Sequence, residues 1–135
     1  MNVVPSFIKR AVDAKLAGQN EMTLTTGDTT IIRDFLDVRD VVRAYYLLFE
    51  KGEKGEVYNI CSGNAVALSQ IIEVIEEKLN IKINTTIDRH LIRPNDNKII
   101  VGDNIKLKTA TGWYQTYSLE QSIEDIIAYF MEYEK

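Results

Sequence analysis

The sequence predicts an α/β protein, because segments with helical periodicity alternate with short β-branched segments along the chain. A length of 135 residues and a hydrophobic content of 45% are typical of one domain with a real core. We therefore expect a single domain, residues 1–135, in which short strands alternate with about four helices.

Helical periodicity is clearest at residues 38–51. Asp37 is a good N-cap, and Asp40 places a carboxylate in the first turn, near the positive end of the helix dipole. The apolar stripe expected to be buried has the spacing i, i+4, i+7 and i+8: Val41, Tyr45, Leu48 and Phe49. This helix is expected to end near Gly52. Further helices are expected to begin near Pro5, with Ser69 as a cap, with Asp103 as a cap of a short helix that Gly112 closes, and near Ser118.

Short strands are predicted between these helices. Residues 22–26 are rich in threonine, residues 31–38 are apolar and β-branched, and residues 81–87 alternate like a half-buried strand. Residues 56–61, EVYNIC, have the composition of a buried strand. Pro94 excludes a helix through the polar segment 88–99.

Composition excludes several classes of function. The net charge is −4 with no basic stripe, so no nucleic-acid partner is expected. No apolar run approaches the ~20 residues of a membrane helix, so no membrane partner is expected either. The single cysteine, Cys61, cannot form an internal disulfide, which is typical of a reducing, cytoplasmic location. One histidine, His90, and no ligand spacing argue against a metal site.

Arg33 lies at the end of an apolar run, just before the chain turns. A guanidinium in this position can bind a phosphate with two parallel hydrogen bonds. It can equally form a structural ion pair with Asp34 or Asp37. The residues alone leave both interpretations open.

The string RDFLDVRDVVRAYYLLFEKGEKGEVYNICSG resembles the extended short-chain dehydrogenase/reductases that act on nucleotide-diphospho-sugars. It is most similar to the GDP-4-keto-6-deoxy-mannose reductases and the GDP-mannose 4,6-dehydratases. The resemblance implies that Arg33 contacts the substrate diphosphate. Val4, in NVVPSF, matches a family position whose backbone flanks the base.

The motif RPND, residues 93–96, is similar to the family's Arg-Pro-x-Asp/Glu. The resemblance implies that Arg93 binds the nucleotide-phosphate part of the substrate and that Asp96 binds the ribose. This pairing is chemically sensible, because a fork of donors suits an anion and an acceptor suits a diol. A solvated turn made rigid by Pro94 is the alternative.

The resemblance covers the whole chain but matches only the second part of the family's sequence. The family's glycine-rich turn is not found, and none of the seven tyrosines has a lysine four residues on. We therefore expect a C-terminal nucleotide-sugar-binding lobe without the Rossmann half that binds NAD(P). No cofactor and no catalytic residue are expected in this chain, which should be inactive alone.

The favoured parent is a GDP-4-keto-6-deoxy-mannose reductase, with a GDP-mannose 4,6-dehydratase or another nucleotide-sugar epimerase or dehydratase as alternatives. A non-catalytic binding or assembly module is an alternative of a different class. Expected partners are a nucleotide-diphospho-sugar, with a GDP-sugar favoured, and the Rossmann half. Without that half, one edge of the strand predicted at 56–61 has no partner, so the chain is expected either to self-associate through this region or to rearrange its neighbours to cover it.

Overall fold

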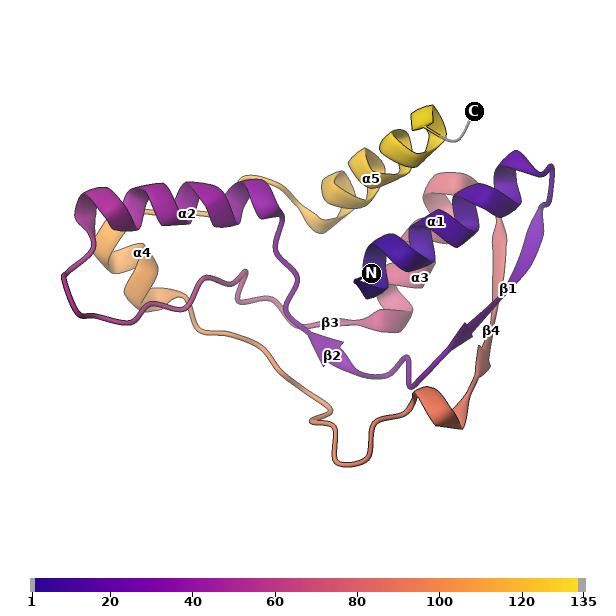
Figure 1. Ribbon diagram of the computed structural model, residues 1–135, viewed down its shortest axis with the longest axis horizontal. Coiled ribbons are helices and arrows are strands. Elements are labelled where there is room, and N and C mark those ends of the chain that lie inside the picture. The colour runs from indigo at the N-terminus through magenta and orange to yellow at the C-terminus, as the bar shows by residue number, and fades with distance from the viewer. Residues whose placement is uncertain (1, 134–135) are drawn as a thin grey trace.

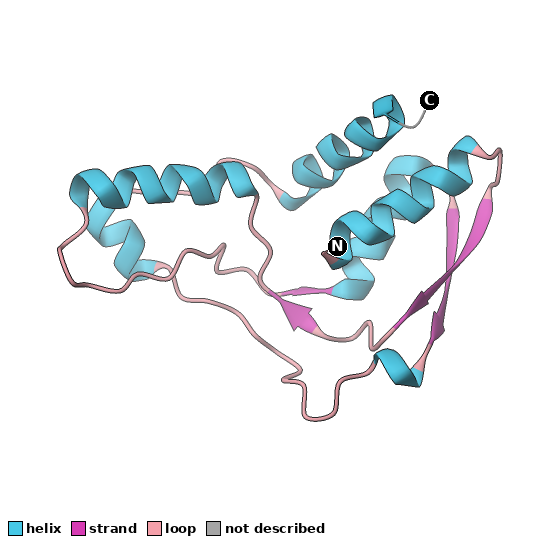
Figure 2. Ribbon diagram, in the orientation of Figure 1, coloured by secondary structure: helices cyan, strands magenta, loops and turns pink. Residues whose placement is uncertain are grey.

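The structure is a computed structural model, and it describes residues 2–133. The helices of the described residues are α1 (Val3–Leu16), α2 (Val38–Lys51), α3 (Leu68–Leu79), the 3₁₀ helix η1 (Arg89–Leu91), α4 (Ile105–Thr111) and α5 (Leu119–Tyr133). The strands are β1 (Glu21–Thr26), β2 (Ile32–Arg33), β3 (Val66–Ala67) and β4 (Lys82–Ile87). The predicted α/β class is confirmed (Figures 1 and 2).

The larger of two bodies is built on the parallel pair β1–β4, whose register runs from Glu21 opposite Lys82 to Thr26 opposite Ile87. Helices α1 and α3 cover this pair, and α5 packs against α1 (Figure 1). Their apolar faces form one core, as expected for amphipathic helices. Its buried members are Val4, Phe7, Ile8, Ala11, Val12, Leu24, Ile71, Ile72, Ile75, Leu79, Ile81, Ile83 and Ile123.

The smaller body consists of α2, α4 and the extended segment 57–61 (Figure 1). Its core has three buried hydrophobic residues, Ala44, Leu107 and Trp113. Trp113 Nε1 also donates a hydrogen bond of 3.0 Å to the backbone oxygen of Asp40. So small a core contributes little to stability, so the smaller body depends on polar contacts and on packing against other parts of the protein.

The short antiparallel pair β2–β3 lies between the two bodies (Figure 2). Ile32 of β2 also forms a bridge to Ile99, so the loop after η1 is attached to the same strand. Arg33 is therefore placed beside that loop.

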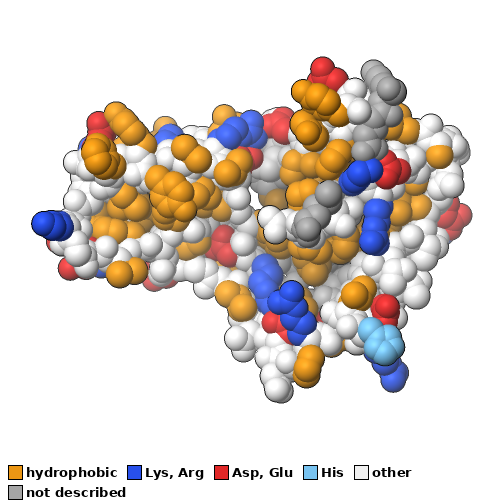
Figure 3. Space-filling model, in the orientation of Figure 1, with side chains coloured by type: hydrophobic (Ala, Val, Ile, Leu, Met, Phe, Trp, Pro, Cys, Tyr) orange, Lys and Arg blue, Asp and Glu red, His pale blue; other side chains and the backbone are white. Residues whose placement is uncertain are grey.

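The predicted apolar stripe of α2 is wrong for Tyr45 and Phe49, which are 61% and 90% exposed. The buried face carries Asp40 and Ala44 instead. A different stripe, with the spacing i, i+4, i+7 and i+11, faces outward: Val38, Val42, Tyr45 and Phe49. We call these four residues the α2 outer stripe, and Figure 3 shows hydrophobic side chains gathered over this part of the molecule.

The strand predicted at residues 56–61 does not form. The segment is extended, but none of the four described strands pairs with it, and Val57 is 78% exposed. A strand needs a neighbour for its backbone hydrogen bonds, and within residues 2–133 this segment has none.

The predicted helix caps have mixed outcomes. Asp37 caps α2 as expected, since its Oδ1 accepts a hydrogen bond of 2.9 Å from Arg39 N. Ser69 is not a cap, because α3 begins one residue earlier and Gln70 Oε1 accepts from Ala67 N instead. Gly112 ends α4 in the left-handed conformation, as predicted.

Candidate functional site

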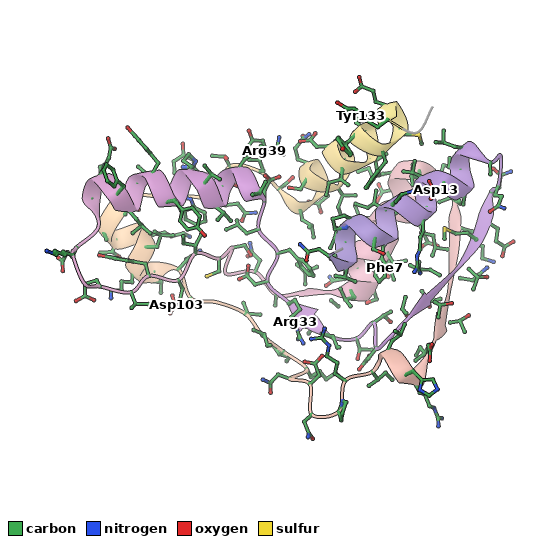
Figure 4. The ribbon with its side chains drawn as sticks, viewed as in Figure 1. Phe7, Asp13, Arg33, Arg39, Asp103 and Tyr133 are labelled. Atoms are coloured by element: carbon green, nitrogen blue, oxygen red, sulfur yellow. The ribbon has the colours of Figure 1, made fainter. Side chains whose placement is uncertain are left out.

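Arg33 is the centre of the candidate site (Figure 4). Its Nη1 donates to Ile32 O at 2.9 Å and to Asn97 O at 2.8 Å. Its Nη2 donates to Asp96 Oδ1 at 3.0 Å, and the two side chains are 23% and 28% exposed. Arg33 thus takes part in an ion pair, as the structural interpretation proposed, but its partner is Asp96 and not Asp34 or Asp37.

The segment Arg93 to Asp96 forms a single tight turn. Asp96 N donates to Arg93 O at 3.3 Å, and Asn95 has φ +62°. Pro94 at the second position and a positive φ at the third are the features of a type II turn. Arg93 and Asp96 thus form the two ends of one turn, although they are three residues apart in the sequence.

The backbone just after this turn is held firmly against β2. Ile32 N donates to Lys98 O at 2.8 Å, and Ile100 N donates to Ile32 O at 3.0 Å. Arg93 is exposed at the other end of the turn, and its side chain has no hydrogen bond or ion pair within residues 2–133. Basic and acidic side chains lie together over β2 and this loop (Figure 3).

Asp34 has a structural role next to Arg33. Its carboxylate accepts from Ser62 N and Gly63 N, both at 2.8 Å, and from Ser62 Oγ at 2.7 Å. Gly102 N donates to the same carboxylate at 3.3 Å, and a Cβ at Gly102 would collide with the side chain of Cys61. Burial raises the pKa of the Cys61 thiol, so this cysteine is packed rather than reactive.

Arg39 joins the two bodies of the molecule. Its Nη2 donates to Asp37 Oδ2 at 2.8 Å and to Asp125 Oδ2 of α5 at 2.7 Å. Its guanidinium lies 3.6 Å from the centroid of the Tyr117 ring. Hydrogen bonds from Arg39 hold the pKa of Asp37 well below its ordinary value, and a separate hydrogen bond from Arg39 lowers the pKa of Asp125.

These lowered pKa values predict acid sensitivity at this joint. An aspartate whose folded pKa lies below its unfolded value of ~3.9 stabilises the fold above that pH, and the contribution is lost as the pH falls below it. We expect Asp37→Asn to lower the urea-unfolding midpoint clearly at neutral pH and progressively less below about pH 4. A difference between the two proteins that stays constant down to pH ~2 would contradict this assignment.

Val4 lies in a separate cavity of about 560 Å³. The cavity is bounded by the start of α1, residues 35–39, residues 115–119 and α5, and the polar side chains in its wall include Asp37, Arg39, Ser122 and Asp125. Arg33, Arg93 and Asp96 do not line it. The structure thus brings three of the four predicted site residues together and places Val4, which is 9% exposed, at a different cavity.

Within residues 2–133, no three His, Cys, Asp or Glu side chains are grouped as metal ligands would be. Over the same range, no helix has the length and apolar character needed to cross a bilayer. Arg33, Arg93 and Asp96 can bind an anion and a hydroxyl group, but they include no acid–base pair suited to carbonyl chemistry.

Comparison with known proteins identifies the family. Residues 1–126 match the family model described as GDP-mannose 4,6 dehydratase. The chain belongs to this family. A GDP-6-deoxy-D-mannose reductase from Pseudomonas aeruginosa is 33% identical over 105 residues, which cover 78% of this chain and 34% of that relative. A UDP-glucose 4-epimerase from Lactobacillus helveticus is 25% identical over 94% of this chain and 38% of its own length.

Solved structures agree with this membership in the GDP-mannose 4,6-dehydratase family. RMD from Pseudomonas aeruginosa, complexed with NADPH, has a TM-score of 0.87 and 29% identity, covering 98% of this chain and 43% of that one. A UDP-glucose 4-epimerase with UDP-glucose from Thermotoga maritima has a TM-score of 0.84 and 28% identity, covering 99% of this chain and 40% of that one. The chain thus spans well under half the length of these family relatives.

Sequence reasoning missed the contact between Arg33 and Asp96. The two residues are 63 positions apart, and no local pattern signals their pairing. The family resemblance was the one available signal, because it assigned both residues to the same bound nucleotide.

Proposed function

We propose that residues 1–135 form the nucleotide-sugar-binding lobe of an NAD(P)-dependent enzyme of the GDP-mannose 4,6-dehydratase family. The favoured parent reduces the C4 ketone of a GDP-4-keto-6-deoxy sugar. One observation carries the proposal: Arg33, Arg93 and Asp96 lie around a single turn. The 33% identity to a GDP-6-deoxy-D-mannose reductase supports the choice of sugar.

The three side chains supply complementary chemistry for a nucleoside diphosphate. Two guanidinium groups can share the charge of a diphosphate, and a carboxylate can accept hydrogen bonds from the ribose diol. Binding energy from the nucleotide then orients the remote sugar for reaction. In this proposal the lobe contributes orientation and affinity, and the groups that move protons lie outside it.

The cofactor belongs to another part of the parent enzyme in this proposal. Gly52 and Gly55 precede an extended segment, whereas a phosphate-binding glycine turn follows a strand and opens a helix. NAD(P)H, when bound to the cofactor half, would supply the hydride. The residues of this lobe would hold the nucleotide-sugar in reach of it.

The α2 outer stripe and segment 57–61 supply a surface for that half. The stripe residues are between 58% and 90% exposed, and extended backbone at 57–61 has no strand partner among residues 2–133. An apolar stripe next to an unpaired strand edge is typical of a surface that another part of a sheet covers. We infer that the cofactor half docks here.

The second candidate function is the nucleotide-sugar-binding lobe of a different enzyme of the family, a dehydratase or an epimerase. The structural likeness to a UDP-glucose 4-epimerase, with a TM-score of 0.84, favours a UDP-sugar as the alternative ligand. If the lobe belongs to a non-catalytic module, the full-length protein would bind the nucleotide-sugar as tightly as an enzyme of the family but would not convert it. A panel of GDP, UDP, dTDP and CDP sugars, titrated by calorimetry, distinguishes the bases.

Arg93→Ala tests the binding role directly. We expect it to weaken binding of the preferred nucleotide-sugar by ~1.5–3 kcal/mol, the usual value of a charge-assisted hydrogen bond. Its effect on stability should be small, because Arg93 is exposed. Arg89→Ala is the matched control, since it removes the same charge from an exposed position four residues away. Normal binding by Arg93→Ala would show that RPND is a structural turn.

The exposed apolar surface predicts self-association of the isolated chain. Association should grow with concentration in sedimentation velocity, and Phe49→Asp should shift the chain to monomer because Phe49 is 90% exposed on the stripe. Gln19→Asp adds the same charge at an exposed position after α1 and should leave association unchanged. A wild-type chain that stays monomeric at every concentration would contradict this prediction.

A further inference from the structure

The carboxylate of Asp34 lies where three segments of the chain meet. Asp34 directly follows Arg33, and the two side chains contact different parts of the molecule. Asp34 Oδ1 accepts from Ser62 N at 2.8 Å and from Ser62 Oγ at 2.7 Å. Its Oδ2 accepts from Gly63 N at 2.8 Å and from Gly102 N at 3.3 Å. Four donors from two other segments therefore converge on one side chain next to Arg33.

The loop that follows the turn of the candidate site is attached at both ends to this pair of residues. Arg33 Nη1 donates to Asn97 O at 2.8 Å, and Gly102 N donates to Asp34. Gly102 also packs against the side chain of Cys61 with no room for a Cβ. A change in the position of Asp34 is therefore transmitted to the loop.

The other two residues that donate to Asp34 adjoin the segment on which we place the cofactor half. Residues 57–61 have no strand partner in the part of the chain that the structure describes, so their position depends on how their ends are held. At the C-terminal end, Asp34 accepts from the amides of Ser62 and Gly63. One carboxylate thus connects the proposed docking segment with the strand that carries Arg33.

We propose that Asp34 is a positioning residue, which couples nucleotide binding at Arg33 to the conformation of residues 62–63, at the end of the docking segment. This role rests on the proposed function and adds to it a link between the nucleotide site and the docking surface. A ligand that orders Arg33 also orders Asp34, and with it the two amides that Asp34 binds. Because coupling between two sites is reciprocal, a docked cofactor half strengthens nucleotide binding by the factor by which a bound nucleotide strengthens docking.

Amide hydrogen exchange of the whole chain, with and without GDP or UDP, measures this coupling. In the wild type we expect the nucleotide that binds more tightly to slow exchange of the Ser62 and Gly63 amides about fivefold or more. Asp34→Asn keeps the size of the side chain but places an NH₂ donor opposite donors that need an acceptor. We expect this variant to lose the ligand-induced slowing and to bind the nucleotide about two- to tenfold more weakly in calorimetric titration.

Two further variants distinguish coupling from a folding defect. Ser62→Ala removes only the hydroxyl group that donates to Asp34 and leaves the backbone donors in place, so it should change both readouts in the same direction but by less. Asp13→Asn makes the same charge change on the exposed face of α1, where Asp13 pairs with Lys9. It should leave both readouts unchanged.

The outcomes separate this role from the proposed function. A wild-type chain that binds the nucleotide without slower exchange at residues 62–63 overturns the coupling alone. Wild-type affinity or an unchanged exchange response in Asp34→Asn would show that Asp34 only holds the local fold, and also overturns the coupling alone. A wild-type chain that binds neither GDP nor UDP overturns the proposed function and the coupling together. Loss of both readouts in Asp34→Asn, with a smaller loss in Ser62→Ala, supports the coupling.

Discussion

Asp40→Ala is expected to destabilise the protein by ~3–5 kcal/mol, because it removes a buried carboxylate and leaves the donors bonded to it without that acceptor. Asp40 is completely buried at the start of α2. Its carboxylate accepts from Thr116 Oγ1 at 2.6 Å, from Tyr117 N at 3.0 Å and from Arg43 Nη2 at 2.9 Å. Truncation leaves the donors of Thr116 and Tyr117 without this acceptor, while Arg43 keeps its bond to Tyr114 O.

The position of Asp40 in the molecule makes this loss large. The segment with Thr116 and Tyr117 connects α4 to α5, so the carboxylate joins the smaller body to the chain that returns to the larger one. Burial raises the pKa of Asp40, but hydrogen bonds from Thr116, Tyr117 and Arg43 outweigh it and lower the pKa overall. The group therefore remains charged at neutral pH.

Urea unfolding monitored by Trp113 fluorescence measures the effect, since Trp113 Nε1 is bonded to the backbone of Asp40. Asp28→Ala is the matched control, because Asp28 caps a surface turn through Thr30 and should cost much less. Asp40→Asn should fall between wild type and Asp40→Ala, as it keeps an acceptor and loses the charge. Equal stability of Asp40→Ala and Asp28→Ala would contradict the role given to this carboxylate.

Helix α2 shows what local sequence can predict and what it cannot. The cap at Asp37 and the end at Gly52 depend on neighbours in sequence, and both predictions are confirmed. Which face of α2 is buried depends on the element that packs against it, here α4. Apolar residues occur on both sides of α2, so periodicity alone could not tell the outer stripe from the face that carries Ala44.

Long-range contacts account for the other differences. Residues 56–61 have the composition of a strand, but strand formation requires an edge that residues 2–133 do not supply. Asp40 was expected to act on the helix dipole, whereas its main partners lie 76 and 77 positions away. At the site, the turn chemistry of Pro94 and Asn95 is local and readable, while the pairing of Asp96 with Arg33 requires the fold.

Arg33→Ala is expected to weaken nucleotide-sugar binding by ~1.5–3 kcal/mol and also to loosen the loop that carries Arg93 and Asp96. The second effect follows from Nη1, which holds the backbone oxygens of Ile32 and Asn97 in the unliganded protein. Amide hydrogen exchange should therefore quicken in residues 96–100.

Arg33→Lys separates charge from geometry at this position. A lysine keeps the positive charge, but a single ammonium cannot bond the two backbone oxygens and a phosphate in the fixed directions of a guanidinium fork. We expect it to bind nearly as poorly as Arg33→Ala, whereas Arg89→Ala binds normally. Full affinity in Arg33→Lys would show that a point charge is sufficient. Full affinity in Arg33→Ala, with faster exchange in the loop, would show that Arg33 positions the turn and that Arg93 alone meets the diphosphate.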